Sequence, residues 1–263
     1  MNWNKAAAPH LPSILTIAGI ALALLLDPIH QPRNYNDFAD QSIVLGIPHA
    51  YDVLSNLGFA LVAVWGWIGL HPRRDHPALR RGWYGYRLFL SSLFLTAAGS
   101  AYYHLAPDNQ RLVWDRLPIA LACAGLLAGV RAETRPDTRI SLYAAAVVLL
   151  ALASVAWWHF TDQPQRPGDL GPYLLLQLSP LLLIPLWQGI YGAPRLDRIW
   201  FGVAILLYVM AKLAELWDHD ILAALGWMSG HTLKHLLATL GAFVLVARLR
   251  SRVQRPVRVP GGV

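Results

Sequence analysis

The chain has 263 residues, of which 56% are apolar and only 14% are charged, and its formal net charge is +7. A soluble globular domain carries about 25% charged residues, so this composition excludes an ordinary soluble protein and favours a membrane protein. The net positive charge does not indicate nucleic-acid binding, because the arginines border apolar segments instead of forming a basic face. The single cysteine, Cys123, lies in an apolar run and allows no internal disulfide.

Apolar runs of roughly 16–20 residues recur along the whole chain, and each could cross a hydrocarbon core of about 30 Å as a helix. The segments between them are short and contain Pro, Gly and Arg, which favours one compact bundle over separate domains. We therefore expect an all-α integral membrane protein with helices near 13–29, 52–70, 87–105, 113–130, 140–159, 172–190, 199–217 and 231–249.

Lysine and arginine are distributed unevenly between the connecting segments. Alternate connections hold 15 of these residues, whereas the intervening ones, at 30–51, 106–116, 160–171 and 218–230, hold 4. Basic residues collect on the cytoplasmic side of a membrane, so this bias places both termini in the cytoplasm. The intervening segments then face the periplasm of a bacterial inner membrane.

The first run, 13–29, has an apolar core like that of a secretory signal peptide. However, the Asp27-Pro28-Ile29-His30 sequence that follows lacks the small-residue pattern of a cleavage site. We therefore expect residues 1–34 to form an N-terminal segment with an extra transmembrane helix.

Polar side chains gather at the predicted non-cytoplasmic helix ends, beginning with Asp37, Asp40, Asp52 and Asn56. Asp52 and Asn56 are four residues apart and share one helix face. Ionisable groups in or beside membrane spans are costly, so each is a functional candidate. Their segregation to one side predicts a polar site near the outer leaflet.

The third and fourth runs contribute a second group to this side. Ser100 and His104 are four residues apart at the end of the third run, and Asp115 opens the fourth. The intervening Pro107-Asp108-Asn109 predicts a turn, so a hairpin brings His104 and Asp115 to the same depth. Taken singly, Asp115 has a simpler interpretation as a partner of Arg116 or a helix cap, and Ser100 as a hydroxyl bonded to its own backbone.

The last two runs complete the group. Glu215 and Asp218 are three residues apart and could bind metal or orient a histidine, although a solvated loop end explains Asp218 and His219 equally well. His231 and His235 lie one helical turn apart on one face. Such a pair in a soluble helix is usually a solvated face, but the start of a membrane helix favours metal ligands.

Three histidines with a nearby carboxylate and hydroxyl fit a catalytic zinc site, in which three protein ligands leave the fourth position for water. Zinc lowers the pKa of that water to about 7 and so makes it a nucleophile at neutral pH. Asp115 would accept the proton of the water and pass it to the leaving group. Ser100 would donate a hydrogen bond to the substrate carbonyl oxygen or the developing oxyanion.

Together these motifs resemble the alkaline ceramidase family, within the CREST superfamily that also holds the progestin and adipoQ receptors. The resemblance covers roughly 35–250 and includes 52–57, Ser100 to His104, Trp114 to Arg116 and Ser229 to His235. It implies a seven-helix core, with 251–263 as a basic cytoplasmic tail. It also implies zinc held by His104, His231 and His235, with Asp115 as proton acceptor and Ser100 assisting, and hydrolysis of the N-acyl bond of ceramide or a related membrane lipid.

Eukaryotic members of that family carry a calcium site in the acidic stretch before the first core helix. Hard oxygen ligands suit calcium, so Asp37, Asp40 and Asp52 are candidates here, although His49 stands where a carboxylate is expected. Asp52 and Asn56 could instead brace the zinc ligands by hydrogen bonding.

Two other functions compete with the hydrolase. The first is a non-enzymatic receptor or lipid sensor that keeps the zinc, and the second is a haem electron carrier. Haem needs axial histidines on opposite sides of the porphyrin, whereas His231 and His235 lie on one side. A transporter is disfavoured, because the sequence shows no internal repeat and no broken-helix signature. The sequence determines neither the lipid head group nor the oligomeric state.

Overall fold

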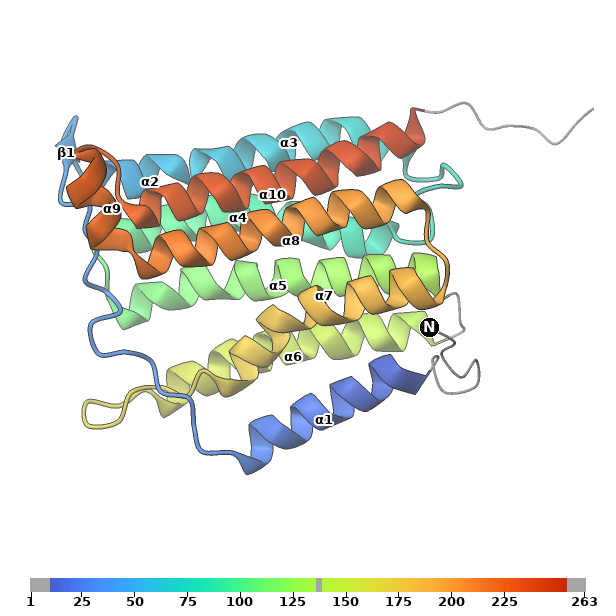
Figure 1. Ribbon diagram of the computed structural model, residues 1–263, viewed down its shortest axis with the longest axis horizontal. Helices are drawn as coiled ribbons and strands as arrows, with labels where there is room; N and C mark the ends of the chain where they lie inside the picture. Colours follow the sequence, from blue (N-terminus) through green and yellow to red (C-terminus); the bar gives the residue numbers. More distant parts are fainter. Residues whose placement is uncertain (1–9, 136–138, 255–263) are drawn as a thin grey trace, which may run out of the picture.

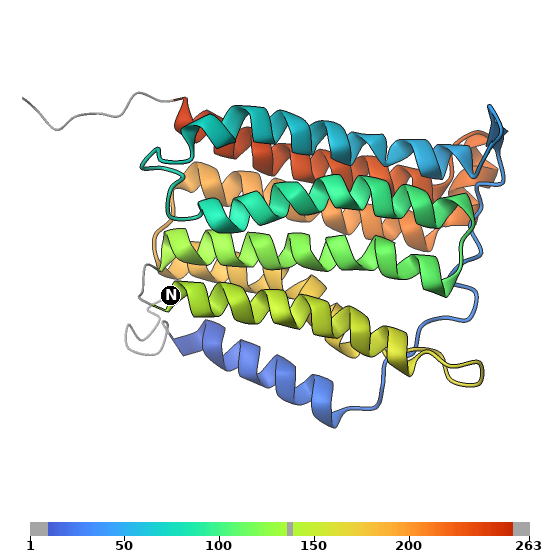
Figure 2. The ribbon, with the colours of Figure 1, turned by 180° about the vertical axis from the view of Figure 1, so that it is seen from behind.

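The computed structural model describes residues 10–135 and 139–254, and it shows long helices running side by side in a bundle (Figure 1). Helices α10, α8 and α7 form one layer, and α3, α4, α5 and α6 lie next to one another in the layer behind (Figure 2). The helices are α1 (Leu11–Leu25), α2 (Ala50–Ser55), α3 (Leu57–Leu70), α4 (Trp83–Leu105), α5 (Asn109–Thr134), α6 (Ile140–Thr161), α7 (Gly171–Ile190), α8 (Arg195–Leu216), α9 (Asp218–Leu225) and α10 (Gly230–Val253), with a 3₁₀ turn at His71–Arg73. The strands β1 (Ile43–Val44) and β2 (Ile47–Pro48) form a small antiparallel hairpin.

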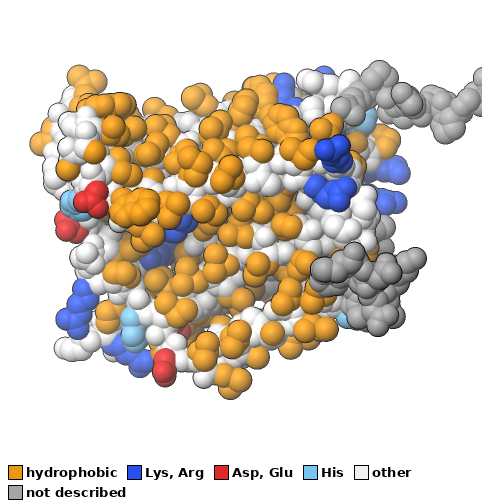
Figure 3. All heavy atoms as spheres, viewed as in Figure 1, with side chains coloured by type: hydrophobic (Ala, Val, Ile, Leu, Met, Phe, Trp, Pro, Cys, Tyr) orange, Lys and Arg blue, Asp and Glu red, His pale blue; other side chains and the backbone are white. Residues whose placement is uncertain are grey.

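Six of the described helical segments are long and apolar enough to cross a membrane. They are 50–73, α5, α6, α7, α8 and α10. Large hydrophobic side chains are exposed along the bundle, and Figure 3 shows them covering the middle of its visible face between two ends that carry charge. A soluble protein rarely exposes so continuous an apolar surface, whereas lipid tails solvate it. The predicted membrane helical bundle is confirmed at this level.

Helix α5 lies at the centre of the bundle, against α4, α6 and α7. Its approach to α4 depends on glycine. A Cβ at Gly125 would lie 2.6 Å from the backbone nitrogen of Phe89 and 2.8 Å from the carbonyl oxygen of Gly85. Because lipid tails are as apolar as leucine, membrane helices associate through such close backbone packing. The contact fixes the rotation of α4 relative to α5.

Helix α1 packs on α7, and its C-terminal connection is held by backbone hydrogen bonds to the loop between α6 and α7. The backbone N–H of Gln31 donates to the carbonyl of Gly168 at 3.1 Å, and that of Leu170 donates to Ile29 at 2.8 Å. The backbone N–H of Ile29 donates to Asp169 Oδ1 at 3.1 Å. The helix itself ends at Leu25, earlier than the predicted 29.

Several helices begin or end elsewhere than predicted, and one helix was not predicted. The predicted helix 52–70 is interrupted at Asn56, because the Asn56 side chain donates to the carbonyl of Asp52 at 2.8 Å. Helix α9 was not predicted, and it ends at Gly226 in the left-handed conformation, φ 76°. Helix α10 continues to Val253 and thus includes the first residues of the predicted tail at 251–263. The rest of that tail, from 255, lies outside the described residues.

Candidate metal centre

The candidate site is built where α4 ends and α10 begins, at the end of the bundle that carries α9 and β1 (Figure 1). On the α4 side, His104 and Ser100 are both 1% exposed. Close helix contact positions them, because a Cβ at Gly99 would collide with the carbonyl oxygen of Trp114. This contact places Ser100 beside the first turns of α5, within reach of Asp115.

On the α10 side, local hydrogen bonds fix the start of the helix. Ser229 is the N-cap, and its hydroxyl accepts a backbone N–H of the first turn at 3.0 Å. The backbone N–H of His231 donates to Asp218 Oδ1 at 2.6 Å. His231 and His235 then follow one turn apart, 3% and 4% exposed.

His104, His231 and His235 converge, and their ligand atoms lie within 4.8 Å of one another. Among the described residues, this is the group of His, Cys, Asp and Glu side chains that could hold a metal ion. His104 Nδ1 is buried and has no hydrogen-bond partner in the described part of the chain. Buried polar atoms are rarely unsatisfied in native proteins, and a metal centre is one setting that explains such an atom. The donor set therefore fits a metal that prefers imidazole.

The ring of His235 is oriented by the helix break at Asn56. Its Nδ1 lies 2.8 Å from Ser55 Oγ and 3.2 Å from the carbonyl oxygen of Asp52. A metal-binding histidine usually donates its second ring N–H to such an acceptor, which leaves the first nitrogen free for the metal. Asp52 and Asn56, which were expected to brace the zinc ligands, both lie beside this ring, Asp52 through its backbone carbonyl and Asn56 with its Nδ2 at 3.4 Å from Nδ1. Ser55 contributes a hydroxyl that the sequence reasoning missed.

Phe38 covers two of the histidines. It is 5% exposed, and its ring centroid lies 4.7 Å from that of His104 and 4.3 Å from that of His231. The adjacent backbone is held in place, because the N–H of Ala39 donates to Asp218 Oδ2 at 2.9 Å. Asp218 therefore links the covering segment to α10 and is not a solvated loop end. Sequence reasoning did not single out Phe38, which has no polar group to mark it.

Lys234 introduces a positive charge beside the histidines. Its Nζ lies 3.3 Å from His231 Nε2 and donates to Glu215 Oε1 at 2.5 Å. Glu215 also pairs with Lys212, so it neither joins the histidine cluster nor touches His231 directly. The sequence carried a signal for Lys234, since a lysine within an apolar span is a functional candidate by default.

Asp115 is 8% exposed and does not pair with Arg116 in the described structure. The guanidinium of Arg116 instead lies 4.0 to 5.4 Å from three aromatic ring centroids, those of Tyr35, Trp158 and Tyr173. This cation–π cage stabilises the charge without a carboxylate. Asp115 hydrogen-bonds with Ser100 and interacts with the charges of both Lys234 and Arg116.

The predicted calcium candidates have other partners. Asp40 accepts the backbone N–H groups of Ser42 and Asp52 at 3.0 Å each. Asp52 Oδ1 accepts the hydroxyl of Thr232 at 2.5 Å, and Asp37 is exposed. Within the described ranges these acids form no cluster that could hold a metal, so calcium gains no support.

The function of this chain has to be inferred from the geometry of the site. A scan against models of protein families and a search of curated proteins found no match to this chain. What the structure establishes is a membrane helical bundle with a buried three-histidine cluster that could bind a metal ion. The ammonium group of Lys234 lies 3.3 Å from His231 Nε2, and Asp115 contacts Ser100, one turn before His104 on α4.

Proposed function

We propose that this chain is a zinc-dependent membrane amidase that hydrolyses the N-acyl bond of ceramide or a related lipid, as a member of the alkaline ceramidase family. The main support is the convergence of His104, His231 and His235, all at most 4% exposed, on one centre. Three imidazoles suit zinc and leave a fourth position open, whereas calcium prefers oxygen ligands. A purely structural zinc site would usually be closed by a fourth protein ligand.

When bound, zinc would activate water and polarise the substrate carbonyl. The histidines would hold the ion, with the ring of His235 fixed by Ser55 and the Asp52 carbonyl. Asp115 would take a proton from the attacking water and deliver it to the leaving amine nitrogen. Ser100 would hold the Asp115 carboxylate in place or donate to the acyl oxygen. The ammonium of Lys234 would stabilise negative charge that develops beside His231.

We further propose that α4 also crosses the membrane, which completes a seven-helix core with α3, α5, α6, α7, α8 and α10, and that α1 is an additional span. Helix α4 has 23 residues, and its many small and polar side chains suit an inner helix packed on α5. The arginine-rich end would face the cytoplasm, so the histidine cluster would face the periplasm of a bacterial inner membrane. The lipid substrate would enter from the bilayer.

The test is the release of fatty acid by the purified protein from ceramides and other N-acyl lipids. Wild type is compared with His231→Ala, with Asp115→Asn and with a chelated sample, and bound zinc is measured by elemental analysis. His159→Ala is the matched control, because His159 lies exposed at the same end of the bundle and outside the cluster. We expect His231→Ala to lose both zinc and activity, Asp115→Asn to lose activity alone, and the control to keep both.

A zinc-loaded, folded wild type that releases no fatty acid from any N-acyl or ester lipid would refute the hydrolase. It would favour the zinc-containing receptor or lipid sensor. Zinc retained at full occupancy by His231→Ala would refute the metal site itself.

A further inference from the structure

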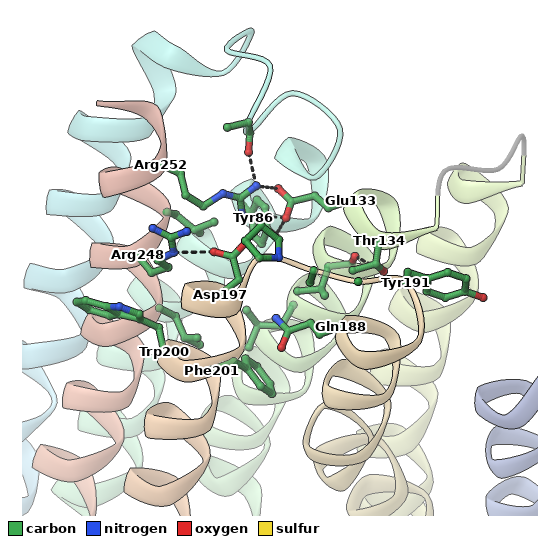
Figure 4. A pocket seen from close by; sticks show the side chains of 18 residues that line it. Tyr86, Glu133, Thr134, Gln188, Tyr191, Asp197, Trp200, Phe201, Arg248 and Arg252 are labelled. Atoms are coloured by element: carbon green, nitrogen blue, oxygen red, sulfur yellow. Dashed lines mark hydrogen bonds and ion pairs between the residues drawn. The ribbon is translucent and has the colours of Figure 1, made fainter. Parts of the chain in front are cut away.

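A cavity lies at the end of the bundle opposite the histidine cluster, between the ends of α5, α7, α8 and α10 (Figure 4). Its volume is about 480 Å³, within the range of small-molecule sites, which is about 300–1,000 Å³. Arg248, on its wall, follows His231 by 17 residues on α10, which is about 25 Å along a helix. The cavity is therefore separate from the histidine cluster.

Two ion pairs form its polar wall, as the dashed lines in Figure 4 show. Arg248 Nε donates to Asp197 Oδ1 at 2.6 Å. Arg252 binds both oxygens of Glu133 at 2.9 and 3.0 Å, and Tyr86 donates to Glu133 at 2.7 Å. These contacts tie α10 to α8 and to α5, and that structural role explains the paired atoms.

Holding the helices together does not explain why Gln188 lies in this cavity. This side chain is 6% exposed, lines the cavity, and its carboxamide has no hydrogen-bond partner in the described part of the chain. Figure 4 shows it below Asp197 and Thr134, between the flanking rings of Trp200 and Tyr191. A carboxamide that lines a cavity and makes no hydrogen bond to the described residues can both donate to and accept from a molecule bound there.

Arg248 and Asp197 also line the cavity. Arg248 Nη2 donates to no group in the described ranges, and Asp197 Oδ2 accepts from none there. The cavity therefore offers donors and acceptors together, and the formal charges of its two arginines and two acids cancel. A phosphate would need an uncompensated cation, whereas a neutral head group with hydroxyl or amide groups can use both kinds of partner.

Most of the remaining lining is apolar. It comes from three of the helices and includes Leu126, Val130, Phe201, Leu245 and Leu249. Such a wall can hold the first part of a hydrocarbon chain while the polar wall holds the head. Since α7 and α8 belong to the membrane-spanning set, a lipid is the amphiphile that this position meets.

We propose that this cavity, defined by Gln188, Asp197, Arg248 and their apolar neighbours, binds a single-chain or N-acyl lipid whose head group is neutral overall and both donates and accepts hydrogen bonds. Binding there does not depend on the histidine cluster. The site lies in the leaflet at the arginine-rich end, opposite the one that contains the candidate metal centre.

The test uses the full-length protein in detergent and a photoactivatable monoacylglycerol with a diazirine in its chain, and crosslinked peptides are identified by mass spectrometry. Unlabelled monooleoylglycerol, N-oleoylethanolamine and phosphatidylglycerol serve as competitors. Gln188→Leu removes the carboxamide, and Ala193→Trp fills the space from a surface loop. Gln177→Leu is the matched control, the same change on α7 away from the cavity.

We expect labelling of peptides from α8 and α10 around Phe201 and Leu245, with competition by the two neutral lipids and not by phosphatidylglycerol. Gln188→Leu should weaken labelling about five- to tenfold, the effect of losing one hydrogen bond, and Gln177→Leu should leave it unchanged. If Gln188→Leu, Gln177→Leu and Ala193→Trp are all labelled as strongly as wild type, the proposed site is wrong. Stronger competition by phosphatidylglycerol would overturn the neutral head group. Because labelling is read directly, neither result depends on hydrolytic activity.

Discussion

Substitution of Glu215 by glutamine tests the charge arrangement beside the histidines. Glu215 is the one carboxylate that pairs with both Lys212 and Lys234 in the described structure. The Glu215 side chain is 15% exposed, Lys234 19% and Lys212 44%. Removing one partner of a buried pair costs about 3–5 kcal/mol, because the remaining charge is left without compensation. Lys212 can reach water, so most of the cost falls on Lys234.

We expect Glu215→Gln to lower the unfolding temperature in detergent by roughly 10 °C, using about 2–4 °C per kcal/mol for a chain of this size. Lys212→Met should cost about 1 kcal/mol or less, as for a partly exposed pair. Glu215→Gln should also reduce zinc occupancy, because an uncompensated ammonium would lie 3.3 Å from His231 Nε2 and repel the cation.

The double variant Glu215→Gln/Lys234→Met tests whether the charges of Glu215 and Lys234 are coupled. It removes both charges, so it should recover most of the lost stability and zinc, since replacing a buried pair by neutral groups is often nearly neutral. The measurements are thermal unfolding and elemental analysis on wild type, Glu215→Gln, Lys234→Met and the double variant. If the effects of the single substitutions simply add in the double variant, the two side chains are not coupled and the reasoning is wrong.

Three further predictions concern packing, cover and chemistry. Gly125→Ala should destabilise the bundle by about 1–3 kcal/mol, because its Cβ would collide with the backbone of α4. Gly202→Ala, whose Cβ would meet nothing within 4 Å, should stabilise the bundle by up to about 1 kcal/mol. Thermal unfolding compares the two variants. Phe38→Ala should cost about 3–5 kcal/mol and speed the removal of zinc by a chelator, and an unchanged rate would show that Phe38 does not cover the centre. Asp115→Asn should lower the rate of amide hydrolysis by about 10²–10⁴-fold with zinc retained, and equal activity would exclude Asp115 as the proton acceptor.

The parts of the fold that were predictable are those that periodic or compositional signals specify. The long apolar runs predicted all of the long helices, because a membrane span needs a minimum apolar length. His104, His231 and His235 could be grouped because the sequence assigned all three to helix ends on the same side of the membrane. The turn at 107–109 was also predictable, and in it Asp108 caps α5 by accepting the backbone N–H of Arg111. Side chains that share a face and a depth can be placed without knowing how the helices pack.

What could not be predicted depends on contacts between distant segments. Phe38 covers the histidines next to a backbone bond between distant segments, in which the N–H of Ala39 donates to Asp218, 179 residues further along the chain. The aromatic cage of Arg116 combines side chains from three separate segments, so neighbouring Asp115 seemed the natural partner. No sequence pattern marks Gln188 as a cavity residue, since a single polar residue in an apolar helix is informative only when its surroundings are known.

The backbone bonds between the segment after α1 and the loop before α7 bear on processing. If a peptidase cut the chain after α1, residues 29–31 would no longer be covalently anchored on their N-terminal side, and their three bonds to 168–170 would have to hold a free chain end. Asp169 also accepts the indole N–H of Trp157 at 2.8 Å, so loss of the bonds to 29–31 would also disturb the last turns of α6. Helix α1 and the segment that follows it are thus joined to the loop from which α7 starts.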